Sequence, residues 1–221
     1  QDLMKDYQAS LKKIVINASE VIPEKARILV YSFSTTVFET IKFQKSLGKS
    51  LEIFITEARP NNEGLVGAQQ FSKIFPTTLL IDAAIGYLLK DANINLVLLG
   101  ADSFTTSELV HKIGTLPLAI TAHNFQIPIY ALTHSLKYYH GTASNYPLPI
   151  ESKPRSEITD LELENLTVRN FYFDHTPLRF LTSMITDKGL FDCSLNQFPE
   201  AEKIPVRQLD LLYQSLKGKS N

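Results

Sequence analysis

The sequence predicts an α/β fold: a Rossmann-like parallel sheet of about six strands, covered by helices on both faces. Short apolar runs alternate five times with segments of helical periodicity, which is the pattern of βαβ units. The apolar runs are almost uninterrupted Val, Ile, Leu and Phe, as strands buried on both faces require. With 221 residues, 44% of them hydrophobic and 20% charged, the chain is long enough to bury such a core.

One helix precedes the sheet. Residues 3–20 carry apolar side chains at helical spacing, and Pro23 ends the segment. Because one face of this helix is apolar, it needs a partner to cover it. We therefore expect an N-terminal helix within residues 1–22 and a single Rossmann-like domain over residues 23–221.

The elements of the sheet follow in order. Continuous apolar runs predict strands at 26–33, 50–58, 77–84, 94–102 and 127–133. Helical spacing predicts helices at 36–48, 63–74 and 107–125, and the third strand runs on into residues 84–92. Gly48 is a typical helix C-cap, Pro76 follows the end of the second helix, and Pro117 marks a kink or a restart in the third.

The last third of the chain is less regular. Residues 134–160 are polar and rich in proline, which indicates a loop or arm. A short apolar run at 166–174 follows, and then helical spacing predicts helices at 177–189 and 205–218.

Composition excludes several classes of protein. The formal net charge is −1 and no basic residues cluster, so we expect no nucleic acid partner. The single cysteine, Cys193, excludes an internal disulfide framework and indicates a reducing compartment. No apolar run approaches the ~20 residues that span a bilayer, and no signal-peptide pattern is present. We therefore expect a cytoplasmic protein without a membrane partner. Because residue 1 is Gln, we expect a trimmed chain or the tail of something longer.

Polar side chains follow the first four predicted strands. In an open parallel sheet, ligands bind where the carboxyl ends of the strands gather, beside helix N-termini that attract anions. This pattern predicts an anion-binding crevice, most simply for phosphate, beside a carboxylate, with Arg59 and Lys112 able to add positive charge. The polar residues at these strand ends are Tyr31, Ser32, Ser34, Thr35, Glu57, Arg59, Glu63, Gly64, Asp82, Asp102 and Ser103.

Common cofactor motifs are missing from the sequence. There is no G-x-G-x-x-G after the first strand and no G-x-x-x-x-G-K-[ST], so NAD binding and P-loop chemistry are not expected. The five histidines and one cysteine lack metal-ligand spacing, so we expect neither a metal nor a cofactor.

Five motifs, in order, resemble a known family. They are "ILVYSFSTTV", "ITEARPNNEG", "LIDAAIGYLL", "LVLLGADSFTTSELVHKIGT" and "NFYFDHTPLRFLTSMITDKG". The family unites regulatory subunits of translation initiation factor 2B with isomerases of methylthioribose-1-phosphate and ribose-1,5-bisphosphate. The resemblance covers roughly residues 5–190 and implies the same Rossmann-like fold.

The resemblance implies roles for two residues at strand ends. The isomerases use the aspartate of Gly-Ala-Asp, which Asp102 matches, and a cysteine at the position of Ser32. A thiol titrates near ~8.5 and can be tuned toward neutrality. A serine hydroxyl is a far weaker acid that needs a nearby base, and no base flanks Ser32 in the sequence.

The residues that would anchor the ligand also depart from the isomerase pattern. Arg59 is kept and Gly64 matches, but Glu63 replaces a glutamine and would repel phosphate. His111 replaces the asparagine of Asn-Lys-Ile-Gly, whereas Lys112 is kept. The resemblance also implies an N-terminal helical domain that supplies basic phosphate ligands in the enzymes, and we expect residues 1–22 to correspond to its last helix.

Each candidate residue also has a structural alternative. Asp102 is either a site residue or the N-cap of a helix. Arg59 either binds phosphate or forms a surface ion pair with Glu57 or Glu63. The hydroxyl of Ser32 is either catalytic or part of a turn. We expect Asp82 to be a cap or a support rather than a catalyst. The aromatic run 171–173 is expected in the core or in a dimer contact.

The leading hypothesis is a non-catalytic, initiation-factor-2B-like protein that binds a phosphorylated sugar or nucleotide, protein partners, or both. The alternative is a divergent aldose–ketose isomerase of a ribose phosphate. In that case Asp102 and Ser32 would be catalytic, and Arg59, Glu63, Gly64, His111 and Lys112 would bind the ligand. The resemblance also implies a homodimer formed through the C-terminal domain.

Overall fold

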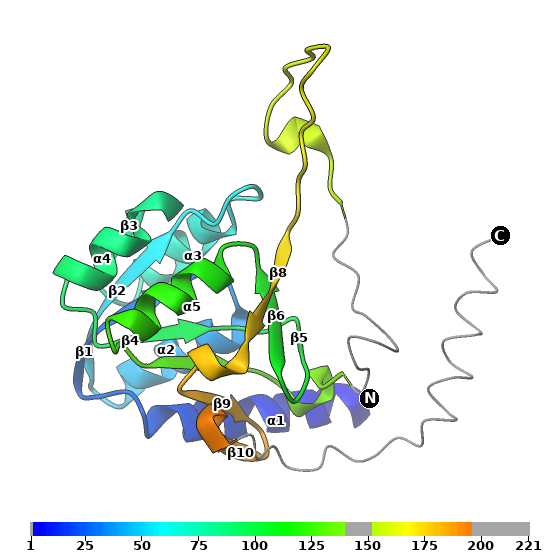
Figure 1. Cartoon of the computed structure of the whole chain (residues 1–221). Coiled ribbons are helices and arrows are strands. Elements are labelled where there is room, and N and C mark those ends of the chain that lie inside the picture. Colours follow the sequence, from blue (N-terminus) through cyan, green and yellow to red (C-terminus); the bar gives the residue numbers. More distant parts are fainter. Residues whose placement is uncertain (1, 140–151, 196–221) are drawn as a thin grey trace, which may run out of the picture.

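A seven-stranded sheet between two layers of helices organises the computed structural model, which describes residues 2–139 and 152–195 (Figure 1). The strand order is β10-β9-β7-β4-β1-β2-β3, and all neighbours are parallel except β10 and β9. The α/β class with a leading helix is therefore confirmed, with one more strand than expected. The helix predicted at 205–218 lies outside the described residues. Among those described, no helix is both long and apolar enough to cross a membrane.

The predicted strands lie close to their expected positions. Five parallel strands come directly from the apolar runs of the sequence, and each run ends in the loop that follows its strand. The strands are β1 (Lys25–Val30), β2 (Ser50–Thr56), β3 (Thr77–Leu80), β4 (Leu96–Leu99) and β7 (Ile129–Leu132).

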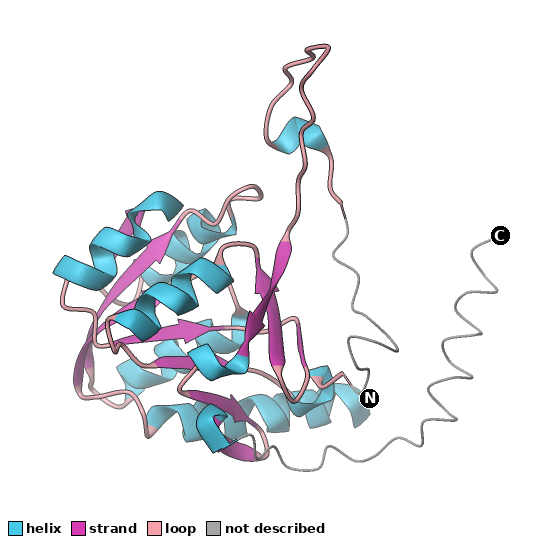
Figure 2. Ribbon diagram, viewed as in Figure 1, coloured by secondary structure: helices cyan, strands magenta, loops and turns pink. Residues whose placement is uncertain are grey.

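Two sets of helices cover the two faces of the sheet (Figure 2). Side chains alternate between the faces of a strand, so Ile28 and Val30 pack on one side and Leu29 and Tyr31 on the other. The first side is covered by α1 (Asp2–Ser19), α2 (Thr35–Ser46) and α3 (Glu63–Phe71). The second is covered by α4 (Ile85–Asp91) and α5 (Thr115–Asn124). The apolar face of α1 thus contributes to the core, while a domain boundary at residue 22 stays a prediction.

The helix predicted at 107–125 is wrong in its first half. Residues of this segment form β6 (Glu108–Lys112), which pairs antiparallel with β5 (Ser103–Phe104) and β8 (Phe173–Pro177). The helix, α5, begins only at Thr115. Pro117 is then its third residue, where a missing N–H costs nothing because the first turn has no helical acceptors.

The helix predicted at 177–189 is also wrong. After a short 3-10 turn, the segment forms β9 (Ser183–Thr186), and β10 (Gly189–Asp192) returns antiparallel to it. All four residues of β9 are buried because Met184 faces one core and Ile185 the other. Two-sided burial therefore decides the structure here, and the apparent helical spacing is coincidental.

An arm projects from the small sheet β5-β6-β8, as Figure 1 shows in yellow and green. Residues 152–160 of the predicted polar loop begin the described part of this arm, and residues up to Tyr172 return to β8. A bridge between Ser152 and Phe171 joins the two strands of the arm toward β8, and a 3-10 turn at Arg155–Glu157 lies farther out (Figure 1).

Candidate functional site

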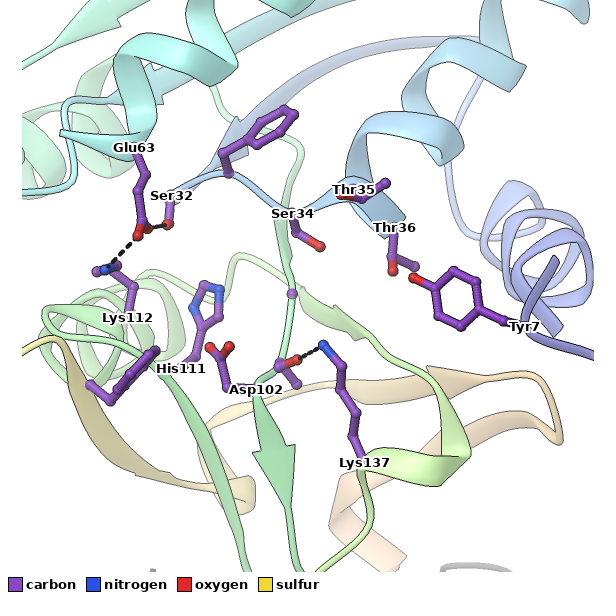
Figure 3. Close-up of a pocket in the computed structure, with 14 residues that line it drawn as sticks. Tyr7, Ser32, Ser34, Thr35, Thr36, Glu63, Asp102, His111, Lys112 and Lys137 are labelled. Atoms are coloured by element: carbon purple, nitrogen blue, oxygen red, sulfur yellow. Dashed lines mark hydrogen bonds and ion pairs between the residues drawn. The ribbon is translucent and has the colours of Figure 1, made fainter. Parts of the chain in front are cut away.

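A cavity of about 260 Å³ lies at the carboxyl ends of β1 and β4 (Figure 3). In the sheet, β1 lies between β2 and β4. After β1 the chain passes through α2 to β2, on the side of β1 away from β4. The loops after β1 and β4 therefore diverge, which is where ligands bind in doubly wound sheets. The cavity is lined by Tyr7, Ser32, Phe33, Ser34, Thr35, Thr36, Glu63, Gly100, Ala101, Asp102, His111, Lys112, Lys137 and Phe173.

The loop after β1 forms one wall of the cavity. Ser32 is buried and has a positive φ of 64°, an uncommon conformation for a residue with a side chain. Ser34 is the N-cap of α2, and its hydroxyl accepts a bond from the Val37 N–H at 3.5 Å. Thr35 and Thr36 then place the start of α2 on the cavity wall. The positive end of the α2 dipole is thus aimed at the cavity.

Glu63, the first residue of α3, connects two other site residues. Ser32 Oγ donates to Glu63 Oε2 at 2.5 Å, and Lys112 Nζ donates to Glu63 Oε1 at 3.0 Å (Figure 3). Burial alone would raise the pKa of Glu63, but the bonds from Ser32, Lys112 and Asn61 lower it below its ordinary value. The carboxylate is therefore ionised, and Lys112 compensates the negative charge that the sequence placed there.

Gly64 supports this arrangement without lining the cavity. A Cβ at this position would lie 1.7 Å from the backbone oxygen of Thr56. Its N–H donates to the Glu57 carbonyl at 3.0 Å and is not free for an anion. The absence of a side chain lets the start of α3 lie against the end of β2, which places Glu63 beside Ser32.

Lys112 is held from the other side by the base of the arm. Its side chain is only 3% exposed, and Nζ lies 4.6 Å from the Tyr172 ring centroid and 5.4 Å from that of Phe173. Cation–π contacts and the Glu63 carboxylate together compensate the buried ammonium. The aromatic run at 171–173 therefore covers a charged residue of the site.

Asp102 follows β4 on the opposite wall and is exposed to the cavity. Partial desolvation raises the pKa of its carboxyl group, and Lys137 and Lys112 oppose that rise. Because β5 and not a helix follows Asp102, the helix-cap alternative is wrong. Its N–H bonds the Val110 carbonyl at 2.9 Å, which joins the β4 loop to β6.

Lys137, which sequence reasoning missed, brings a second ammonium group to the cavity. Nζ donates to the Ala101 carbonyl at 2.6 Å, which leaves two N–H donors for a ligand. The residue follows β7, so the rule that ligands gather at carboxyl strand ends could have found it. Tyr7 of α1, also missed, lines the same side and stacks on His134 with ring centroids 5.4 Å apart.

His111 is buried beside Asp102 and Lys112. Its Nδ1 lies 2.9 Å from Thr115 Oγ1. Burial, reinforced by the Lys112 charge, lowers the pKa of His111 to about 3, so the ring is neutral.

Arg59 and Asp82 lie outside the cavity lining. Asp82 accepts the N–H groups of Ala58 and Arg59 at 2.9 and 2.7 Å, so it supports the loop after β2, as expected. The Arg59 guanidinium donates to the Glu157 carbonyl of the arm at 3.2 Å. A role for Arg59 in phosphate binding stays a prediction from the resemblance.

Four helices begin at this edge of the sheet, and in two of them, α3 and α5, the first N–H groups already have acceptors within the chain. The Asp174 carboxylate accepts the N–H groups of Gly114 and Leu116 at the start of α5, at 2.8 and 3.1 Å. At the start of α3, the N–H groups of Gly64 and Leu65 donate to the Glu57 and Asn62 carbonyls at 3.0 and 3.1 Å. The start of α2 opens into the cavity, which makes it the natural place for an anion.

Comparison with known proteins identifies relatives of this architecture. Residues 1–193 match the model of the initiation factor 2 subunit family. The chain is 29% identical to ribose 1,5-bisphosphate isomerase of Haloferax volcanii, over 94% of this chain and 65% of that protein. It is 33% identical to methylthioribose-1-phosphate isomerase of Pelotomaculum thermopropionicum, over 77% and 51%.

Relatives named as initiation factors match equally well. The chain is 31% identical to translation initiation factor eIF2B subunit alpha of Caenorhabditis elegans, over 86% of this chain and 62% of that protein. Among solved structures, eIF-2B subunit delta from A. fulgidus has the same fold, with a TM-score of 0.78 at 23% identity, covering 86% of this chain and 60% of that one. The chain thus spans about half to two thirds of the length of these relatives.

Proposed function

The chain belongs to the initiation factor 2 subunit family, and we propose that it is a non-catalytic, initiation-factor-2B-like member that binds a phosphorylated small molecule in the cavity. Its relatives include proteins named as initiation factor subunits and proteins named as ribose-phosphate isomerases. The choice between these two functions therefore depends on the site itself.

The start of α2 and Lys137 support binding of a phosphate group. The first N–H groups of α2 have no helical acceptor, and the hydroxyl groups of Ser34, Thr35 and Thr36 line the same wall. Lys137 adds a positive charge with two free donors. A phosphate here would meet backbone donors, hydroxyls and an ammonium group together.

The Ser32–Glu63 hydrogen bond carries the non-catalytic part of the proposal. The structure does provide an acceptor for Ser32 that the sequence did not reveal, namely the Glu63 carboxylate. However, the pKa of Glu63 is lowered, so this carboxylate is too weak a base to take a proton from an alcohol. Ser32 is thus buried and hydrogen-bonded, without the acidity of the thiol in the isomerase pattern.

A divergent aldose–ketose isomerase is the second candidate, and Asp102 favours it. This carboxyl is open to the cavity and has a raised pKa, as a residue that exchanges protons with a sugar requires. If the chain is an isomerase, Asp102→Asn will abolish turnover while the fold survives.

A thermal-shift panel tests ligand binding. It would contain ribose and methylthioribose phosphates, nucleoside monophosphates and inorganic phosphate. A ligand at ~100 times its Kd adds ~2.7 kcal/mol, which for a chain of this length raises the unfolding midpoint by roughly 5–10 °C. We expect a shift with at least one phosphorylated compound, and no shift with any of them would overturn the proposal.

Variants then locate the ligand. Lys137→Ala should remove most of the shift, whereas Lys90→Ala, on the exposed end of α4 across the sheet, should leave it unchanged. Arg59→Ala tests the phosphate role implied by the resemblance. Loss of the shift in Arg59→Ala but not in Lys137→Ala would move the phosphate to the β2 loop.

We also propose that the chain forms a homodimer through its C-terminal part. The arm exposes several large apolar side chains, which is unusual for a surface in water. They are Ile158, Leu161, Leu163 and Leu166, between 41% and 63% exposed.

A further inference from the structure

The hydrogen bonds around Thr115 determine which nitrogen of His111 carries a proton. Thr115 Oγ1 lies 2.6 Å from the Lys112 carbonyl, which can only accept, so the hydroxyl proton is donated there. Because a hydroxyl has one proton, Oγ1 can only accept from His111 Nδ1 at 2.9 Å. We therefore assign the proton of the ring to Nδ1.

The ring carries no second proton. His111 is only 4% exposed and lies beside the ammonium group of Lys112. Burial and the neighbouring positive charge therefore both disfavour the imidazolium form of its ring. A neutral ring with its proton on Nδ1 has a lone pair on Nε2. His111 Nε2 is therefore a hydrogen-bond acceptor that cannot donate.

The free nitrogen faces the cavity. His111 lines the cavity, and within residues 2–139 and 152–195 no hydrogen bond reaches Nε2. Gly100 lines the cavity close to this nitrogen, since an added Cβ at Gly100 would lie 3.5 Å from Nε2. Nε2 is thus an acceptor that is open to the cavity, and a ligand group that donates to it from the cavity would complete its hydrogen bonding.

Building on the proposed function, we propose that His111 determines specificity by requiring a hydroxyl group on the phosphorylated ligand. A sugar hydroxyl can donate to Nε2, whereas an ionised phosphate oxygen can only accept and would be repelled there. The phosphate then points to the start of α2 and Lys137. Figure 3 shows Lys137 and Thr36 away from the Ser32–Glu63–Lys112 cluster. The phosphate and the hydroxyl groups of a ligand would therefore bind in different parts of the cavity. An asparagine, as in the isomerase pattern, could present either a donor or an acceptor, but His111 cannot.

The proton position is tested first, without ligand. Nitrogen NMR of the ¹⁵N-histidine-labelled chain at pH 7, with His111 assigned by loss of its signals in His111→Gln, distinguishes the two tautomers. We expect a protonated Nδ1 and a bare Nε2 in the wild type and in Thr115→Ser, which keeps the hydroxyl. Thr115→Val, which removes it, should shift the ring toward the other tautomer. A wild-type ring protonated on Nε2 overturns the inference.

Ligand choice is tested next by calorimetry with ribose 5-phosphate and tetrahydrofurfuryl phosphate, which has the ring and phosphate but no hydroxyl groups. The wild type should bind ribose 5-phosphate more tightly by about tenfold, the effect of one hydrogen bond. His111→Phe and Thr115→Val should lose this preference and Thr115→Ser should keep it. Equal binding of both compounds by the wild type overturns the inference alone. Binding of neither overturns the inference, and the proposed function falls with it only if no phosphorylated compound of the thermal-shift panel binds either.

Discussion

Glu63 shows how one residue can change the character of a site. From the sequence, its carboxylate was expected to repel a phosphate. In the structure, the same carboxylate accepts from Ser32 and forms an ion pair with Lys112, so its charge is used within the protein. The difference arises because a pattern of residues along the chain does not reveal which side chain faces which across 49 residues.

Replacing Glu63 with glutamine should destabilise the chain. The Lys112 side chain is 3% exposed and would lose its carboxylate, which is strongly unfavourable for a buried ammonium. Because the Glu63 side chain is 33% exposed, solvent reduces this cost to about 1–3 kcal/mol. Urea unfolding measures it, with Glu39→Gln on the surface of α2 as a control that should change little. Equal stability of Glu63→Gln and wild type would contradict the account.

The pH dependence of that difference has a definite sign. A carboxyl whose pKa is lowered by folding stabilises the protein above its unfolded pKa, and this contribution is lost as the pH falls through the folded value. The difference in the free energy of unfolding between wild type and Glu63→Gln should therefore be constant from pH 7 down to about 4.5, the ordinary pKa of a glutamate. Below that pH the difference should become smaller. A gap that widens on acidification would show that the pKa of Glu63 is raised instead.

At the scale of elements, the start of α5 explains two motifs that lie far apart in the sequence. Gly114 has a φ of 99°, and a Cβ there would lie 2.1 Å from Tyr31 Oη, so Lys-Ile-Gly-Thr requires glycine. Asp174 of the Phe-Asp-x-Thr-Pro motif caps the same helix start. Both motifs thus position β6, which carries His111 and Lys112.

Removing this cap should weaken the whole region. Asp174→Ala leaves two N–H groups without acceptors, which costs about 1–2 kcal/mol. Asp174→Asn keeps one acceptor oxygen and should lose less. Hydrogen exchange should show faster exchange of the Gly114 and Leu116 amides in the alanine variant, and unchanged rates there would contradict a capping role.

The sequence predicts the five parallel strands more reliably than it predicts the other segments that line or support the site. The five apolar runs became the five parallel strands because two-sided burial leaves an unambiguous pattern. Residues 108–112 and 183–186 were predicted as helix because their partners, β8 and β7, lie far along the chain. Asp102 ends one of the apolar runs, whereas Lys137 lies beyond the end of β7, within the polar segment 134–160, so the sequence marks Asp102 more clearly than Lys137.

In the whole molecule, the cavity lies where the loops after β1 and β4 diverge. The arm projects from the small sheet β5-β6-β8, beside this cavity. The base of the arm covers Lys112 with Tyr172 and Phe173, so the arm and the site share residues. A partner that binds the arm would therefore lie near the cavity.

The proposed homodimer predicts a mass near twice the 24.9 kDa of the chain. Light scattering after size exclusion measures it. Replacing Leu161 and Leu163 with glutamine should lower the mass toward the monomer, because these exposed side chains would be buried between copies. The matched control is Leu47→Gln, which is exposed at the end of α2. A wild type that is monomeric at micromolar concentration would contradict the homodimer.

We propose that the cavity binds a phosphorylated sugar without converting it. The most direct measurement is ³¹P NMR of ribose 1,5-bisphosphate incubated with the wild-type chain. We expect the ribose 1,5-bisphosphate resonances to shift or broaden on binding, and no ketose bisphosphate signal to appear. A growing ketose signal that Asp102→Asn abolishes would establish the isomerase instead, and resonances unchanged by saturating protein would contradict binding at the cavity.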